Sequence, residues 1–181
     1  MNSNMKSLVK FSGYISLIVY FCLVILKKPI DLIEYIELLS ESVGLVIFIV
    51  LTYEKWLWRF NPLIKTPKFK KEYSGLLKYN YGGTLGEKEV EISIKQTLLS
   101  TRIKIKTDEI ISKSITSEML EEDGEYVLYY SYKTNPLSEY SDKNPIQFGT
   151  CRLLIDDVEQ FQGQYWTSSK TIGDLYFKAK I

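Results

Sequence analysis

Histidine is entirely absent from this 181-residue sequence. Its absence excludes Ser-His-Asp and Cys-His catalytic groups, every histidine-ligated metal site, and the side chain that usually senses pH near neutrality. Cysteine is scarce as well, because only Cys22 in an apolar run and Cys151 in an expected strand are present, with no CxxC spacing. The sequence therefore gives no sign of a disulfide framework or a metal site, and it favours a protein that is not an enzyme.

An excess of charge of either sign is also missing. The chain has 23 Lys and Arg against 22 Asp and Glu, and its pI is near 7.6. A protein that holds duplex nucleic acid mainly by a basic face needs a clustered positive surface, so we expect no nucleic acid polymer as a partner. A small anionic ligand remains compatible with this balance.

Hydrophobic residues concentrate near the N-terminus. Residues 11–26 are all apolar, small or aromatic, and Lys10, Lys27 and Lys28 flank them. About 20 apolar residues span a bilayer core, and about 17 suffice when flanking lysines extend to the interface. This run predicts a first transmembrane helix. A cleavable signal peptide fits poorly, because Lys27, Lys28 and Pro29 occupy the place of a cleavage site.

A second apolar run extends over residues 36–58. Its core is uninterrupted over residues 43–51, and Tyr53, Trp56 and Trp58 form an aromatic belt at its far end. The short polar connection before it predicts two antiparallel helices.

The distribution of basic residues predicts the orientation of this hairpin, because basic residues stay on the cytoplasmic side. The connection between the helices carries only Lys27 and Lys28, whereas six basic residues follow the second run: Lys55, Arg59, Lys65, Lys68, Lys70 and Lys71. We expect a multi-pass membrane protein with both termini and the remaining chain in the cytoplasm.

Glu41 precedes the apolar core of the second run and has two interpretations. Inside the hydrocarbon layer it would face a partner helix or water, since exposure to lipid costs at least about 2.5 kcal/mol. Alternatively the helix begins at Ser42, and both Glu37 and Glu41 are solvated near its N-terminus.

The pattern changes after a proline-containing linker at residues 59–69. Val90, Ile92 and Ile94 alternate with charged or polar residues, which is typical of half-buried antiparallel strands. The same reading gives eight strands, near residues 72–81, 87–97, 100–107, 109–119, 125–134, 146–155, 160–169 and 173–181. Turn residues separate most of them, and no long helical pattern lies between.

Eight strands with short connections match an up-and-down barrel or a sandwich, and closure is the simpler way to avoid exposed edges. We therefore predict a membrane-anchored all-β protein in which two N-terminal transmembrane helices precede an eight-stranded up-and-down, lipocalin-like β-barrel. The expected domains are a two-helix hairpin at 1–58, a linker at 59–69 and a cytoplasmic barrel at 70–181. A barrel of this size has room for side chains or one small ligand.

The 14 tyrosines are many for this length. Tyr126, Tyr130 and Tyr132 share one face of the fifth expected strand, and Tyr165 and Thr167 share a face of the seventh. A tyrosine offers a flat ring for stacking and a hydroxyl for hydrogen bonding, which suits a nucleobase. Strands also favour Tyr and Thr for purely structural reasons.

The order of several short motifs resembles the two-transmembrane β-barrel effectors of bacterial CBASS antiphage systems, the SMODS-associated β-strand-rich effectors. The similarity covers nearly the whole chain. It rests on the joint order of two apolar helices, Lys55-Trp56-Leu57-Trp58, Pro62, Pro67, Gly75-Leu76, Ile94-Lys95-Gln96, Tyr130-Ser131-Tyr132, Asn135-Pro136, Phe148-Gly149-Thr150, Gly163-Gln164-Tyr165-Trp166-Thr167, Lys170-Thr171 and Gly173.

This resemblance implies a sensor and an effector in one chain. A partner nucleotidyltransferase makes a cyclic dinucleotide during infection, the barrel binds it, and the protein forms a homo-oligomer that disrupts the inner membrane and causes abortive infection. No cofactor is implied beyond the cyclic dinucleotide as activating ligand.

A cyclic dinucleotide is a dianion with two bases, so its pocket needs aromatic faces, hydrogen-bonding groups and cations. We expect these from Tyr79, Gln96, Tyr130, Tyr132, Asn135, Thr150, Arg152, Tyr165, Thr167, Lys170 and Thr171. The chain has Ser169 where family members often carry arginine, which weakens a phosphate contact through Lys170.

Two other functions fit parts of the sequence. A membrane-tethered, lipocalin-like barrel could carry a lipid or another apolar molecule, and its interior would then be largely apolar. A hydrolase without histidine would need paired carboxylates, for which Asp156, Asp157 and Glu159 are the candidates.

Overall fold

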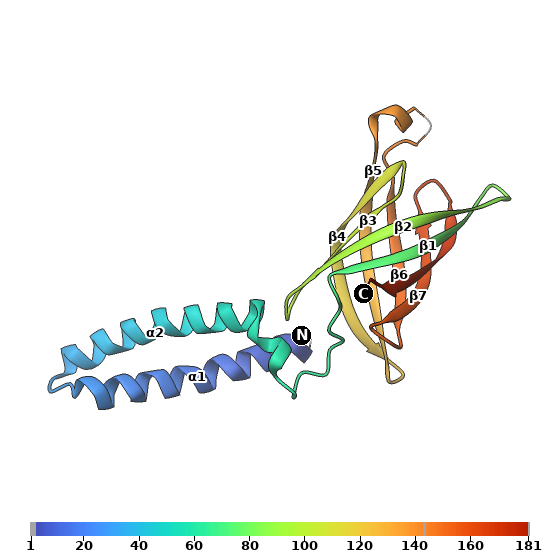
Figure 1. Cartoon of the computed structure of the whole chain (residues 1–181). Helices are drawn as coiled ribbons and strands as arrows, with labels where there is room; N and C mark the ends of the chain where they lie inside the picture. The colour runs from blue at the N-terminus through green and yellow to red at the C-terminus, as the bar shows by residue number, and fades with distance from the viewer. Residues whose placement is uncertain (1–2, 143, 181) are drawn as a thin grey trace. The chain divides into compact units, whose positions relative to one another are not determined.

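The computed structural model describes residues 3–142 and 144–180 and contains two long helices followed by eight strands (Figure 1). The helices are α1 Ser3–Lys27 and α2 Leu32–Lys55, with short 3-10 helices η1 Leu57–Phe60 and η2 Ser138–Tyr140. The strands are β1 Glu72–Tyr81, β2 Thr84–Gln96, β3 Thr101–Lys106, β4 Ile110–Glu122, β5 Glu125–Pro136, β6 Phe148–Ile155, β7 Gln160–Thr167 and β8 Ile172–Ala179. This confirms two N-terminal apolar helices and a closed antiparallel barrel.

The chain divides into two compact units. The helical unit contains the chain up to residue 65 together with residues 97–99, and the barrel unit contains residues 66–96 and the chain from residue 100 onward.

Helix α2 begins earlier than the sequence indicated, because Asp31 caps it. The Asp31 Oδ1 accepts a hydrogen bond from the Glu34 backbone N at 2.9 Å, and the Glu34 Oε2 accepts one from the Ile30 backbone N at 2.7 Å. This reciprocal arrangement satisfies two backbone donors that a helix start would otherwise leave unpaired. The interpretation that α2 begins at Ser42 is therefore wrong.

Glu41 consequently lies within α2, and it has a partner in the same hairpin. Its Oε2 is 2.5 Å from the Nζ of Lys27, the last residue of α1. An acidic group in this position is neutralised by the neighbouring helix, so its pairing requires no second copy of the chain.

One face of α2 packs on α1. Leu38, Ser42, Val46 and Tyr53 are buried, and the Tyr53 ring stacks on Phe11 of α1 with centroids 4.1 Å apart. Most remaining apolar side chains of both helices are exposed. Both helices are long and apolar enough to cross a membrane, and their exposed apolar surface is what lipid would cover.

The segment after α2 folds back onto the helices. Trp58 and Ile64 are buried with Tyr53, and Leu98 completes this apolar cluster at 3% exposure. Leu98 donates its backbone N–H to the Glu54 carbonyl oxygen at 3.0 Å and accepts a hydrogen bond from the Asn4 side chain at 3.1 Å. The connection between β2 and β3 is thus part of the helical unit.

The barrel closes in sequential order from β1 to β8, which pairs with β1 again. Alternation sends Val90, Ile92 and Ile94 of β2 inward, and register pairs Ile92 with Tyr73 and Ile94 with Ile103. The strand bounds differ from expectation mainly in β2 and β4, which are each 13 residues long, and β4 contains an irregularity between Ser114 and Thr116.

The barrel interior is filled unevenly along its axis. At the end where β1 begins, Phe161 contacts Phe69, Tyr73 and Phe177 with ring centroids 5.0 to 5.5 Å apart. We call these four residues the aromatic plug. Edge-to-face packing of such rings contributes beyond the burial of their area, so this end is a solid core.

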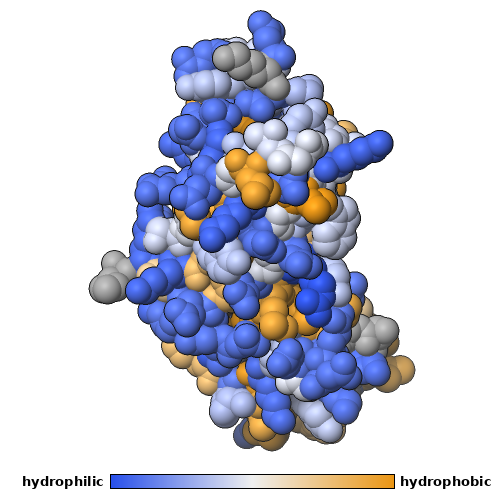
Figure 2. All heavy atoms as spheres, turned by 90° about the vertical axis from the view of Figure 1, so that its right-hand side faces the viewer, coloured by the Kyte–Doolittle hydropathy of each residue, from blue (hydrophilic) through white to orange (hydrophobic). Residues whose placement is uncertain are grey.

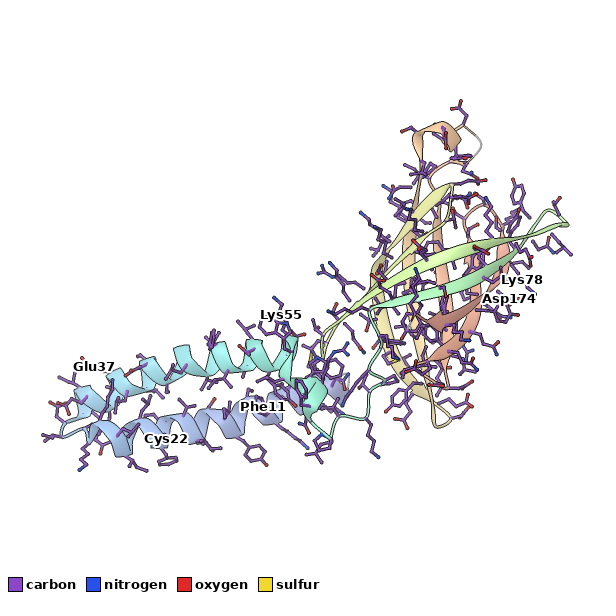
Figure 3. All side chains as sticks on the ribbon, viewed as in Figure 1. Phe11, Cys22, Glu37, Lys55, Lys78 and Asp174 are labelled. Atoms are coloured by element: carbon purple, nitrogen blue, oxygen red, sulfur yellow. The ribbon has the colours of Figure 1, made fainter. Side chains whose placement is uncertain are left out.

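The outer wall of the barrel is mainly polar. Figure 2 shows a largely hydrophilic face on which hydrophobic residues form separate small areas. Lys78 of β1 and Asp174 of β8 are register partners on this outer wall (Figure 3). Charged residues at such positions keep the wall soluble, and the Lys78 Nζ lies over the Tyr176 ring, 5.6 Å from its centroid.

Replacing Phe161 with Ala should destabilise the chain strongly, by about 3 to 5 kcal/mol, because it removes the central ring of the aromatic plug and leaves a cavity. Chemical denaturation of the full chain in detergent micelles measures this loss. Gln162→Ala is the matched control, because Gln162 is the next residue of β7 and is exposed. Equal stability of the two variants would contradict the plug's structural role.

Candidate functional site

A cavity of about 510 Å³ occupies the barrel half opposite the aromatic plug. Its wall includes six tyrosines, Tyr79, Tyr81, Tyr130, Tyr132, Tyr140 and Tyr165. Six hydroxyl-bearing residues accompany them: Thr107, Ser112, Thr134, Thr167, Ser169 and Thr171. Pockets of this size hold small organic ligands, and this one offers both aromatic faces and hydrogen-bonding groups.

Glycines opposite three of these tyrosines make room for their rings. In each case the tyrosine pairs with a glycine on a neighbouring strand, and a Cβ added to that glycine would overlap ring atoms. The pairs are Tyr79 with Gly86, Tyr132 with Gly149, and Tyr165 with Gly173. The rings therefore lie against the barrel wall, which keeps the centre of the cavity open.

Burial keeps the inner tyrosines neutral. Loss of solvation raises the pKa of the Tyr130, Tyr132 and Tyr165 phenols, because the charged phenolate is disfavoured away from water. The same cause raises the pKa of the Cys151 thiol to about 12. All four groups stay protonated at neutral pH, so the phenols remain hydrogen-bond donors.

Tyr130 differs from the other cavity residues in one respect. Its ring lies 5.8 Å from that of Tyr132, and its buried hydroxyl faces the Cys151 thiol, a weak hydrogen-bonding group, with no stronger partner among the described residues. A buried polar group without a partner costs free energy comparable to a lost hydrogen bond. A bound molecule that reaches this hydroxyl would supply the stronger acceptor that the wall itself lacks.

The structure brings together six of the eleven residues that the sequence nominated. Tyr79, Tyr130, Tyr132, Tyr165, Thr167 and Thr171 all line the cavity. Their common feature is the inward position on β1, β5 and β7 or on the turn that leads into β8.

The other five residues lie elsewhere. Gln96 bonds the backbone of Phe69 and Pro67, and Arg152 bonds the Tyr129 hydroxyl at 2.9 Å and Glu122 at 3.1 Å. Thr150 and Asn135 occupy alternate positions to the inward residues Cys151 and Thr134. Lys170 is exposed in the turn between β7 and β8, with a positive φ of 64°.

Sequence reasoning missed Lys88 and the connection between β5 and β6. Lys88 shares the inward face of β2 with Val90 and Ile92, so period-two alternation alone would have placed it inside. Tyr140, Asn144 and Gln147 reach the cavity from a long connection, and no pattern in the sequence fixes where such a loop folds.

The carboxylates considered for a hydrolase have structural partners outside this cavity. The Asp157 Oδ1 accepts a hydrogen bond from the Glu159 backbone N at 2.9 Å, and the Glu159 carboxylate pairs with Lys70 at 2.8 Å. Among the described residues, no group of three or more Cys, Asp or Glu side chains is arranged to hold a metal ion.

Comparison with known proteins identifies relatives for both parts of the chain. The family described as "Cap15, cyclic dinucleotide receptor domain" matches residues 64–179. A protein named "CD-NTase-associated protein 15" from Staphylococcus schleiferi is 38% identical over 181 residues, which cover 98% of each chain.

The family match covers all eight strands and thus the entire wall of the cavity. The curated relative extends the similarity through both N-terminal helices. Together they confirm the resemblance to CBASS effectors that the sequence motifs indicated, and this chain belongs to the Cap15 family.

Proposed function

We propose that this protein is an antiphage effector whose barrel binds a cyclic dinucleotide in the tyrosine-lined cavity. Binding causes the chain to oligomerise and to disrupt the inner membrane, which leads to abortive infection. The ligand comes from a partner nucleotidyltransferase, and the chain itself is a receptor without a catalytic role. The membership in the Cap15 family supports the ligand class.

The observation that carries this proposal is the cavity wall, which is rich in tyrosine and threonine and includes Tyr130, whose buried hydroxyl has only the weak Cys151 thiol beside it. Bases stack on flat aromatic rings, with about 1 to 3 kcal/mol per base, and their edges form hydrogen bonds with neutral phenols. A cyclic dinucleotide has two bases and several acceptor atoms, so it matches both features of the wall.

A lipid-carrying barrel is the contrasting function, and the composition of the wall argues against it. Leu77, Ile105 and Leu175 are apolar contributors to the cavity, but hydroxyl groups surround them. Thr107, Thr134 and Thr167 already bond the backbone through their hydroxyl groups. An acyl chain would displace water from the tyrosine hydroxyls of the wall and offer them no acceptor, at a cost for each one.

The two helices supply the membrane part of the proposal. Their lengths of 25 and 24 residues suffice to span, and the basic residues after α2 favour a cytoplasmic barrel with both termini on the same side. To change the ratio of the membrane-disrupting state to the resting state from 1:99 to 99:1, a ligand must bind the membrane-disrupting state more tightly by roughly 5.5 kcal/mol. Ligand contacts and oligomer formation would share this requirement.

Replacing Tyr130 with Phe should weaken cyclic dinucleotide binding by about tenfold, while thermal stability stays the same or rises, since the lost hydroxyl has only the Cys151 thiol as a weak partner in the unliganded protein. Calorimetry of the full chain in detergent micelles against cyclic di-AMP, cyclic di-GMP and cyclic UMP–AMP, with linear dinucleotides as controls, measures the affinity.

Tyr129→Phe is the matched control for this variant, because Tyr129 neighbours Tyr130 on β5 but its hydroxyl bonds Arg152. It should not change the affinity. Wild-type protein that is folded and binds none of the cyclic probes would refute the proposed function, and copurifying lipid would then support the carrier.

The chain should lose stability at alkaline pH. Above about pH 10, unfolded tyrosines release their protons while the buried phenols retain theirs, so unfolding is favoured by up to about 1.4 kcal/mol per pH unit for each such group. Melting temperatures between pH 8 and pH 11 measure the decline. The double variant Tyr132→Phe, Tyr165→Phe should show a smaller decline than Tyr176→Phe, which alters a tyrosine that is 41% exposed.

Replacing Gly44 with Leu should weaken membrane disruption and leave ligand binding intact. Gly44 is exposed on α2, and a Cβ added there meets no atom within 4 Å, so the hairpin itself tolerates the change. Small residues allow helices of separate copies to approach closely in a membrane. Dye release from liposomes, with Val43→Leu as the control, tests this expectation, and loss of ligand binding in Gly44→Leu would count against it.

A further inference from the structure

The cavity holds one basic side chain among the described residues that line it. Lys88 lies on the inward face of β2 and lines the cavity. The two cations that the sequence nominated lie elsewhere, because Arg152 pairs with Glu122 on the outer wall and Lys170 is exposed in a turn. A ligand with negative phosphodiester groups would therefore find its cation in Lys88.

Lys88 is already paired with carboxylates in the unliganded protein. Its Nζ lies 2.6 Å from the Oε2 of Glu109 and 3.8 Å from the Oδ1 of Asp108. The side chains of Lys88 and Glu109 are only 25% and 26% exposed, so water screens this pair incompletely. The Glu109 carboxylate occupies the place that a phosphate oxygen would take beside the ammonium group.

Glu109 is held in this position from its other side. The same Oε2 accepts a hydrogen bond from the Asn144 Nδ2 at 3.0 Å, and both residues line the cavity. The Glu109 carbonyl oxygen also accepts the backbone N–H of Leu137 at 2.8 Å. Hydrogen bonds from the connection between β5 and β6 thus hold the Glu109 carboxylate beside Lys88.

We propose that Lys88 is the phosphate-binding residue of the cavity and that Glu109 is an internal competitor for it. A phosphodiester oxygen of the ligand takes the place of the Glu109 carboxylate at the Lys88 Nζ. This inference rests on the proposed function and adds that the cavity selects negatively charged ligands over neutral ones. Neutral molecules of similar shape cannot displace a carboxylate from an ammonium group, because they gain no comparable charge-assisted bond.

Neutralising Lys88 and neutralising Glu109 should change the affinity for a cyclic dinucleotide in opposite directions. Lys88→Gln removes the cation and should weaken cyclic dinucleotide binding by at least about tenfold. Glu109→Gln removes the competitor, retains a carbonyl oxygen for Asn144, and should strengthen binding by about threefold to tenfold. Misfolding of a variant does not produce a gain in affinity, so the second result is specific.

Calorimetry of the full chain in detergent micelles with cyclic di-AMP, cyclic di-GMP and cyclic UMP–AMP tests this inference. Lys88→Arg should keep most of the affinity, and the double variant Lys88→Gln, Glu109→Gln should lose the gain over wild type that Glu109→Gln shows, because that gain needs the Lys88 ammonium group. Glu91→Gln is the matched control, since the Glu91 carboxylate pairs with Lys180 at 2.8 Å and does not line the cavity.

Two results would overturn the inference while the proposed function stands: unchanged binding in Lys88→Gln, or unchanged or weaker binding in Glu109→Gln. Wild-type protein that binds none of the three cyclic probes would contradict the proposed function itself and the inference with it.

Discussion

Closure of the sheet is the constraint on which the rest of the barrel depends. Eight strands enclose an interior just wide enough for side chains or one small ligand. Each inward side chain therefore either packs in a filled core or lines a cavity. This chain does both, in separate halves. Four aromatic residues and the aliphatic residues packed with them fill one half, and in the other half glycines on the wall let Tyr79, Tyr132 and Tyr165 lie flat. The solid half compensates for the packing contacts that the cavity lacks.

The wall of the hollow half carries polar groups that need hydrogen-bonding or charged partners from a ligand. Buried phenols stay neutral, the Tyr130 hydroxyl has only the weak Cys151 thiol beside it, and the one cavity cation described is held by Glu109. An apolar occupant would offer no acceptor to the phenol hydroxyls, whereas a ligand with bases and phosphates would supply acceptors for them. The polar wall therefore supports the proposed binding of a cyclic dinucleotide in this cavity.

Much of the fold could be predicted from the sequence, and the reasons are visible in particular residues. The alternation of Val90, Ile92 and Ile94 fixes which face of β2 turns inward, and long apolar runs mark both helices. The start of α2 was misplaced because the signal lies in a short capping pair, Asp31 and Glu34, outside the apolar run.

The site was predicted less completely. Tyrosines on inward strand positions were found, because their residue type and their spacing agree. The charge of Arg152 suggested a ligand contact, but Arg152 follows the inward residue Cys151 on β6 and therefore lies on the outer face of the barrel. Lys88 was missed, although the alternation of β2 places it on the inner face with Val90 and Ile92. The loop residue Asn144 depends on contacts between distant segments, which no local pattern contains.

The position of Leu98 bears on how this protein can be divided. The turn between β2 and β3 belongs to the helical unit, where Leu98 is buried against Tyr53, Trp58 and Ile64. A fragment that begins after residue 65 would keep this turn but lose the residues that cover it. Its loop tip would then present an apolar side chain and unpaired backbone groups to water, which favours self-association unrelated to any ligand. Aggregation of an isolated barrel would therefore be an artefact of where the chain was cut and no measure of its activated state.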